Sequence, residues 1–131
     1  MPFLKDRLAS LSDAASFERT AIEAFRWQYV HTPVYSDWCR QLGVEADRVR
    51  RLEDIPFLPI SFFKSHSVLQ NDATVYKRFL SSGTQGPRSA HSLTKEALEV
   101  YQTFSRKAFE LLFGPIKDRP ILALLPHYLQ N

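Results

Sequence analysis

Hydrophobic residues recur at helical spacing in two long stretches of the chain, which are separated by a region without that period. The first stretch runs from Asp13 to Tyr29, and Ser12 or Asp13 is suited to cap it because both side chains accept hydrogen bonds from a first helical turn. The spacing predicts a long helix there and shorter helices over 3–11 and 35–42. The expected apolar face of the long helix contains Phe17, Ala21, Ala24 and Phe25. We therefore expect the first third of the chain to be mainly helical.

The second periodic stretch runs from Lys95 to Phe113 and has a signal at each end. Thr94 is suited to be the N-cap, and Gly114 followed by Pro115 ends the helix. The residues at core spacing are Ala97, Tyr101, Phe104, Ala108 and Leu111. The pattern predicts a second long amphipathic helix whose apolar stripe is expected to lie in the core.

The region between the two stretches favours extended structure. The segment from Glu53 to Lys64 has two prolines three positions apart, so it cannot form a regular helix before Pro59, and its apolar residues are expected to pack as an extended segment. Strands are predicted over 75–80 and 89–93, and a third over the apolar run 121–125. That run lacks polar alternation, which is typical of a strand covered on both faces. Because such a strand needs more neighbours than the chain supplies, we expect 1–131 to be one incomplete lobe without an internal boundary.

Composition limits the classes of protein that fit. The 131-residue chain has 17 Lys and Arg against 14 Asp and Glu, and its net charge of +3 is too small to indicate a nucleic-acid or membrane partner. Cys39 is the only cysteine, which excludes an internal disulfide framework. No apolar run approaches the roughly 18 residues of a membrane span. These features predict a soluble cytoplasmic protein.

A glycine-containing loop between the first two predicted strands is the strongest candidate for a binding site. The stretch Ser81-Ser82-Gly83-Thr84-Gln85-Gly86 holds two of the four glycines in the chain, and Arg88 follows it. Glycine permits positive φ and removes the Cβ that keeps a ligand away, so successive backbone N–H groups can converge on phosphate oxygens. Serine and threonine hydroxyls add donors, and arginine adds a cation. A hairpin turn, which favours the same residue types, is the alternative interpretation.

Other glycine motifs fit this loop less well. The P-loop pattern lacks its lysine after the second glycine, and a dinucleotide fingerprint lacks its third glycine. The spacing of Gly83 and Gly86 matches the letters of a KH-domain loop. That loop joins two helices, however, whereas here a predicted strand precedes the glycines and Pro87 follows them.

The stretch FLSSGTQGPRSAH (79–91) resembles the phosphate-binding motif of adenylate-forming enzymes, in the form seen in the acyl-protein synthetases of bacterial bioluminescence and in phenylacetate-CoA ligases. The similarity extends to IPFLPISFFKSHSVL (55–69) upstream and to ILALLPHYLQN (121–131) downstream. The first fifty residues match only as a helical lead-in. The resemblance implies an α/β fold: a helical N-terminal region over 1–50, then over 51–131 the start of the adenylate-forming-enzyme sheet with its covering helices.

The resemblance also implies an activity. Such enzymes use ATP and Mg²⁺ to convert a carboxylate, here a fatty or other organic acid, into an acyl-adenylate and pyrophosphate, and then pass the acyl group to a thiol. Preorganised donors in the loop stabilise the charge of the departing pyrophosphate. The implied partners are a small-molecule carboxylate and an acyl reductase or acyl-acceptor protein, with no nucleic acid and no membrane span. The phosphate-binding residues carried over by the resemblance are Ser81, Ser82, Gly83, Thr84, Gln85, Gly86, Arg88 and His91.

The match has departures from the family pattern. Gln85 stands where the family usually has a second threonine, and Arg88 lies near the position of a lysine in many adenylating enzymes. The adenine pocket, the magnesium-binding acidic residue, the acyl-accepting cysteine and the catalytic lysine of the family belong to segments beyond Asn131. We therefore expect the N-terminal part of such an enzyme, with no catalytic residue of its own and weak phosphate binding at most.

Three further features are interpreted as structural. Ser61 and Lys64 have the Ser-x-x-Lys spacing of penicillin-binding proteins, but the partner motifs are missing. Cys39 lies on a short predicted helix, where a small apolar residue is the usual role. The four histidines show no metal-ligand spacing. A different class of function also stays open, namely a non-catalytic α/β interaction domain whose glycine loop is only a turn and whose exposed apolar surface binds a partner.

Overall fold

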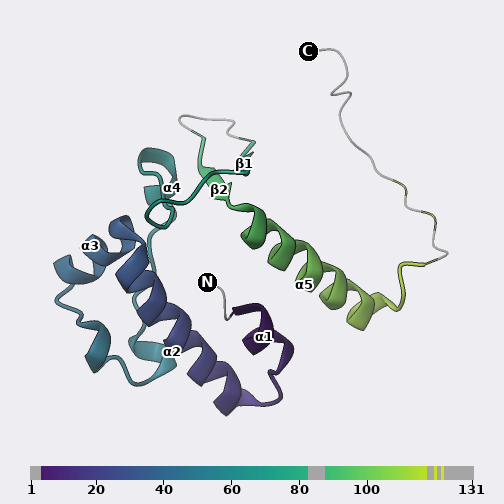
Figure 1. Cartoon of the computed structure of the whole chain (residues 1–131), viewed down its shortest axis with the longest axis horizontal. Coiled ribbons are helices and arrows are strands. Elements are labelled where there is room, and N and C mark those ends of the chain that lie inside the picture. Colours follow the sequence, from purple (N-terminus) through teal and green to yellow (C-terminus); the bar gives the residue numbers. More distant parts are fainter. Residues whose placement is uncertain (1–3, 83–87, 118–119, 121, 123–131) are drawn as a thin grey trace. The chain divides into compact units, whose positions relative to one another are not determined.

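The computed structural model describes residues 4–82, 88–117, 120 and 122, and Figure 1 shows the course of the chain. The chain divides into two compact units, Met1–Leu98 and Glu99–Asn131. The described part is mainly helical and contains one two-stranded antiparallel sheet. The larger sheet implied by the resemblance stays a prediction. The elements in chain order are α1 (Leu4–Ala9), α2 (Ala14–His31), α3 (Pro33–Gln41), the 3₁₀ turns η1 (Ala46–Arg48) and η2 (Leu52–Asp54), α4 (Phe62–Ser65), β1 (Lys77–Leu80), β2 (Ala90–Leu93) and α5 (Lys95–Phe113).

Helix α2 begins where its capping signal predicts. The carboxylate oxygen Oδ1 of Asp13 accepts a hydrogen bond of 2.7 Å from the Ser16 backbone N–H, and the Ser16 hydroxyl accepts one of 3.1 Å from the Asp13 N–H. This reciprocal capping box satisfies two donors that a helix start otherwise leaves unpaired. The helix continues to His31, two residues beyond its predicted end.

Helix α3 begins at Pro33, two residues before the predicted start. Proline suits a first helical position because a backbone N–H there has no acceptor within the helix, so the lack of an N–H in proline costs no hydrogen bond. The helix ends at Gln41, and Gly43 takes the left-handed conformation with φ +69°. Its N–H donates to the Arg40 carbonyl at 3.0 Å. The predicted stop at Gly43 is therefore confirmed.

The core of the first unit lies between α2, α3 and the segment that follows them. Its buried hydrophobic side chains are Phe25, Tyr35, Cys39 and Val49. The rings of Phe25 and Tyr35 meet edge to face, with their centroids 6.0 Å apart. The Tyr35 hydroxyl donates a hydrogen bond of 2.6 Å to the carbonyl of Pro56. This bond ties the extended chain after η2 to helix α3.

The proline-containing segment is not a regular helix before Pro59, as predicted, and α4 begins only at Phe62. Ile55 and Leu58 pack against the core, also as expected. The expectation is wrong for Phe57, whose side chain is 89% exposed. An extended chain turns successive side chains to opposite sides, so only some of them can face one core.

Strands β1 and β2 confirm the first two predicted strands with slightly shorter bounds. They pair antiparallel, with Lys77 opposite Leu93 and Leu80 opposite Ala90. The hairpin therefore presents the glycine-containing loop at its closed end. The predicted third strand over 121–125 lies outside the described residues, apart from position 122.

Helix α5 confirms its predicted bounds at both ends. The Thr94 hydroxyl accepts a hydrogen bond of 3.2 Å from the Ala97 backbone N–H. Gly114 has φ +78° and donates its N–H to the Glu110 carbonyl at 2.9 Å. The expected core position of its apolar stripe is not met: this helix is described in full and has no buried side chain, and Leu111 is 86% exposed. Helical periodicity identifies the face that can be covered but not the segment that covers it.

Candidate phosphate-binding site

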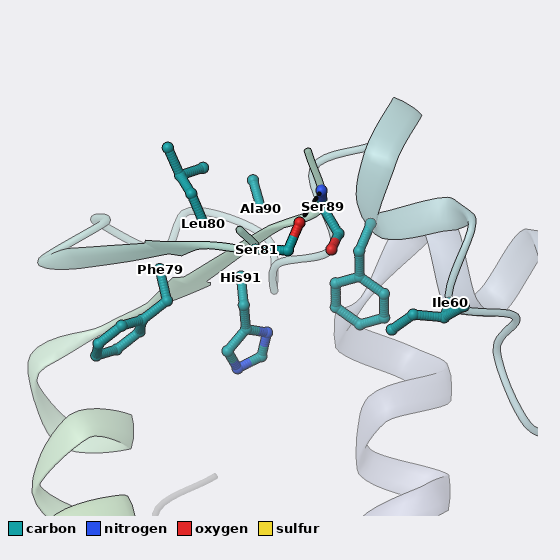
Figure 2. Close-up of a pocket in the computed structure, with 8 residues that line it drawn as sticks. Ile60, Phe79, Leu80, Ser81, Ser89, Ala90 and His91 are labelled. Atoms are coloured by element: carbon teal, nitrogen blue, oxygen red, sulfur yellow. Dashed lines mark hydrogen bonds between the residues drawn. The ribbon is translucent and has the colours of Figure 1, made fainter. Parts of the chain in front are cut away.

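The hairpin of β1 and β2 holds the two ends of the glycine-containing loop. The last strand pair is Leu80 with Ala90. The ladder continues one step further, because the Ser81 N–H donates to the Ser89 carbonyl at 3.0 Å. The two serines therefore lie side by side at the base of the loop (Figure 2).

A second hydrogen bond joins Ser81 and Ser89. The Ser81 hydroxyl oxygen accepts from the Ser89 backbone N–H at 3.1 Å, and Figure 2 shows this bond as a dashed line. Both backbone N–H groups at the loop base are thus used within the protein and are not available to an anion. A serine hydroxyl is a donor as well as an acceptor. The Ser81 O–H, for which the described part of the chain shows no acceptor, remains able to donate to a ligand.

The other predicted loop residues fall into two groups. Ser82 and Arg88 are described, and both side chains are exposed. The remaining four lie outside the described residues, so the converging backbone N–H groups stay a prediction. These four are Gly83, Thr84, Gln85 and Gly86.

The hairpin carries a local excess of positive charge. Between Val75 and Leu93 the sequence contains Lys77, Arg78 and Arg88 but no Asp or Glu. Arg78 lies across the two strands, and its Nε donates to the Ser92 hydroxyl at 3.3 Å. An excess of cations raises the local concentration of anions. The charge of this segment therefore favours a phosphate ligand.

A cavity of about 330 Å³, called here the sub-loop cavity, adjoins the base of the loop within the first unit. His91 points to the same side of the hairpin as Phe79 (Figure 2). The ring of His91 lies tilted against that of Phe63, with the centroids 5.7 Å apart. Of the predicted site residues, Ser81 and His91 are brought together at this cavity. The lining residues are Ile60, Phe63, Phe79, Leu80, Ser81, Ser89, Ala90 and His91.

Several of these residues are not identified by the sequence motif. The strand register identifies Ser89: because Leu80 pairs with Ala90, the next pair towards the loop is Ser81 with Ser89. Phe63 comes from α4, an earlier segment with no local pattern that links it to the hairpin. Its contact with β2 arises from tertiary packing alone.

The remaining candidate groups support no second site. Cys39 is fully buried, and burial raises the pKa of its thiol, so little thiolate is available as a nucleophile. Ser61 and Lys64 are exposed and are joined by a backbone hydrogen bond of 3.0 Å, as in a helical turn. In the described ranges, no three His, Cys, Asp or Glu residues are placed to hold a metal ion. None of the described helices is long and apolar enough to cross a membrane.

Comparison with known proteins shows consistent similarity. The family model described as acyl-protein synthetase, LuxE, matches residues 8–124. The chain is 36% identical over 77 residues to a long-chain-fatty-acid–luciferin-component ligase of Vibrio harveyi. This aligned stretch covers 58% of this chain and 20% of that protein. The chain is also 34% identical over 73 residues to a protein of the same name from Photorhabdus luminescens. This second aligned stretch covers 55% of this chain and 62% of that protein. No solved structure matches the chain significantly.

The chain thus spans about a fifth of the length of the first relative and less than two thirds of the second. The family model, by contrast, covers most of the chain, including both strands of the hairpin and the loop between them. The chain therefore belongs to the LuxE acyl-protein synthetase family.

Proposed function

We propose that this chain supplies the ATP-phosphate site of an enzyme that activates a long-chain fatty acid and transfers the acyl group to a thiol. The observation that carries the proposal is the doubly bonded pair of Ser81 and Ser89, which closes the base of the loop and leaves the Ser81 O–H able to donate. Family membership supports acyl-protein synthesis. The names of the two relatives support a long-chain fatty acid as the substrate.

In the proposed reaction, a carboxylate oxygen of the acid attacks the α-phosphorus of ATP. The bond from that phosphorus to the bridging oxygen breaks, and pyrophosphate leaves with the electron pair. A thiolate then attacks the acyl carbonyl carbon, so that a thioester forms and AMP leaves. In the proposal, N–H and O–H donors of the loop bind the β- and γ-phosphates. Such donors stabilise the charge that develops on pyrophosphate as it leaves.

Magnesium, which the resemblance implies, prefers oxygen ligands such as carboxylates. The hairpin segment from Val75 to Leu93 has no Asp or Glu. The described residues also contain no group of three potential metal ligands. The hairpin therefore fits the anionic phosphates and does not fit a metal site held by protein carboxylates.

The affinity of this chain for ATP is expected to be weak. Hydrogen bonds to charged groups contribute about 1.5–3 kcal/mol each, so three of them contribute about 6 kcal/mol. The loss of translational and rotational freedom costs about 4 kcal/mol or more. The remainder of about 2 kcal/mol or less corresponds to a dissociation constant on the order of tens of millimolar or weaker.

Titration of the isotope-labelled chain with ATP and magnesium chloride, followed by NMR, tests the proposal. We expect saturable shifts of the backbone amide signals of Ser82, Gly83, Gly86 and Arg88. Gly83→Val is expected to abolish the shifts, because a β-branched side chain hinders close approach of the backbone to phosphate. Ser82→Ala should weaken binding, whereas Ser105→Ala, at an exposed position on α5, is the matched control and should leave it unchanged.

The opposite outcome is equally informative. A folded chain whose loop amide signals do not respond to ATP even at about 100 mM, which exceeds the expected dissociation constant, contradicts the proposal. It then favours the alternative in which the loop is a structural turn of an interaction domain. Equal responses of the parent chain and Gly83→Val also contradict a role for the glycine.

A further inference from the structure

His91 lies close to the base of the glycine-containing loop, on one face of the hairpin. It is directly opposite Phe79 in the register of the two strands, and Figure 2 shows both side chains on the same side. Ser89, two residues before His91, is paired with Ser81. Residues two apart in a strand are separated by about 7 Å. The backbone of His91 is therefore close to the serine pair, and its side chain lines the same cavity.

The ring of Phe63 restrains the His91 imidazole. His91 is exposed, and an exposed side chain usually exchanges among several staggered rotamers. The ring of Phe63 lies tilted by 52° against that of His91, with the centroids 5.7 Å apart. At this spacing two aromatic rings attract each other beyond the effect of burial. The contact therefore favours the rotamer in which the imidazole lies against Phe63.

Phe63 is in turn held in place through helix α3. Its neighbour on α4, Phe62, packs edge to face on Trp38, with the ring centroids 5.3 Å apart. The indole Nε1–H of Trp38 donates a hydrogen bond of 3.0 Å to the Phe57 carbonyl, which ties the indole to the segment before α4. Successive residues of a helix point about 100° apart. Helix α4 can therefore contact α3 through Phe62 and β2 through Phe63.

These contacts link the core of the first unit to His91. Trp38 packs against the buried core cluster, and α4 contacts both Trp38 and His91. A side chain that is ordered before a ligand arrives loses less conformational entropy on binding. An imidazole N–H can donate to an anionic oxygen. A restrained His91 therefore binds an anion more favourably than one that exchanges among rotamers.

We propose that Phe63 is a positioning residue for His91: its ring fixes the imidazole at the cavity shared with Ser81 before a phosphate ligand binds. Phe63 acts only through His91 and does not contact the ligand. The choice of phosphate as the ligand rests on the proposed function. The restraint on His91 does not, because it is a property of the chain without a ligand.

NMR of the ligand-free 131-residue chain tests the restraint. The three-bond couplings between Hα and the two Hβ atoms of His91 report its χ1 rotamer, and we expect the values of a single staggered rotamer. Phe63→Leu removes the ring and keeps an apolar side chain, so the couplings should move to rotamer-averaged values. Phe63→Tyr keeps the ring and should retain the parent couplings.

Phe79→Leu is the matched control, because it removes a ring of the same size from the position opposite His91 on the same face of the hairpin. We expect its His91 couplings to stay close to those of the parent chain. Equal averaging in Phe63→Leu and Phe79→Leu overturns the proposal, because the restraint then belongs to the strand pair and not to α4.

Two further results overturn the positioning role. One is a set of rotamer-averaged His91 couplings already in the parent chain. The other is a set of parent-like couplings in Phe63→Leu while circular dichroism shows that this variant is folded. Nuclear Overhauser contacts between the ring protons of Phe63 and His91 in the parent chain keep the test valid if Phe63→Leu fails to fold. Absence of these contacts overturns the proposal as well.

Titration with ATP and magnesium chloride relates the restraint to ligand binding. Because binding is expected to be weak, the measurement is the initial slope of the Ser82 amide shift against ATP concentration. Phe63→Leu is expected to lower this slope about threefold to tenfold, the size expected from the cost of ordering one side chain. In a chain that already contains His91→Ala, Phe63→Leu should have no further effect, because it acts only through His91. A further loss in that chain overturns the proposal.

The positioning role and the phosphate site can fail separately. Averaged His91 couplings in Phe63→Leu, with no response of Ser82 to ATP in any chain, overturn the phosphate site and leave the restraint in place. A response of Ser82 to ATP, with parent-like His91 couplings in folded Phe63→Leu, overturns only the positioning role.

Discussion

The Ser81 hydroxyl oxygen and the Ser89 backbone N–H meet at 3.1 Å, across the two strands that enter and leave the glycine-containing loop. The 3.0 Å bond from the Ser81 N–H to the Ser89 carbonyl runs beside it. Together the two bonds hold the ends of the loop at one spacing. A residue expected to contact phosphate therefore also has a structural role.

Ser81→Ala is expected to loosen the base of the loop. The substitution leaves the Ser89 N–H without its acceptor, and the loss of one such bond costs about 1 kcal/mol. Hydrogen exchange of the Ser89 amide should then become roughly fivefold faster, because local opening becomes easier. Ser81→Thr keeps the hydroxyl and is the control. An unchanged exchange rate in Ser81→Ala would show that the bond does not restrain the loop.

Asp13→Ala is expected to lower the melting temperature by a few degrees near neutral pH, because it removes the cap of α2. The backbone N–H of Ser16, and then its hydroxyl, hold the pKa of Asp13 below its usual value of 3.8. The ionised cap therefore stabilises the fold fully above that value, and its contribution is lost as the pH falls from 3.8 through the lower pKa of the folded chain. Thermal melts of the two chains should converge under strongly acidic conditions. A difference in melting temperature between the two chains that stays constant with pH contradicts the role of the Asp13 charge.

Gly43→Ala is expected to destabilise the first unit by roughly 1 kcal/mol, through backbone strain alone. Gly43 has φ +69°, a left-handed conformation that residues with a Cβ rarely adopt. A Cβ added there meets no atom within 4 Å, so no steric clash contributes. Urea unfolding measures the change, and Gly43→Asn should cost less because asparagine tolerates this conformation better. Equal stability of Gly43→Ala and the parent chain would be the contradicting result.

Cys39 is expected to be unreactive towards a thiol reagent in the folded chain. Its side chain is fully buried, and burial raises the pKa of the thiol, whereas the thiolate is the reactive form. Mass spectrometry should show one modified thiol per chain in denaturing urea and none after the same time in buffer. Rapid modification of the folded chain would contradict this account.

Local signals in the sequence predict the ends of the long helices well. Asp13 at the start of α2, and Thr94 and Gly114 at the ends of α5, act through hydrogen bonds to residues at most four positions away, so a short stretch of sequence contains the whole interaction. The same holds for the left-handed stop at Gly43. These features depend little on the rest of the fold.

Contacts between distant segments are less predictable. Nothing near Phe63 indicates that its ring lies against His91, because that contact depends on how α4 packs on the hairpin. Hydrophobic residues are also buried less often than their pattern predicts. Phe57 is expected to pack in the extended segment, and Leu111 is expected to lie on the buried face of α5, but both side chains are exposed. The motif predicts Ser81 as a ligand residue, and only the pairing of the strands reveals its bonds with Ser89.

The most direct test of the central claim compares three ligands at one amide signal, that of Ser82. The loop is proposed to bind the β- and γ-phosphates of ATP, so ATP and pyrophosphate, each with magnesium, should shift this signal in the same direction and compete with one another, while AMP should leave it unmoved. A response to AMP as large as that to ATP, or no response to any of the three ligands, would contradict the claim.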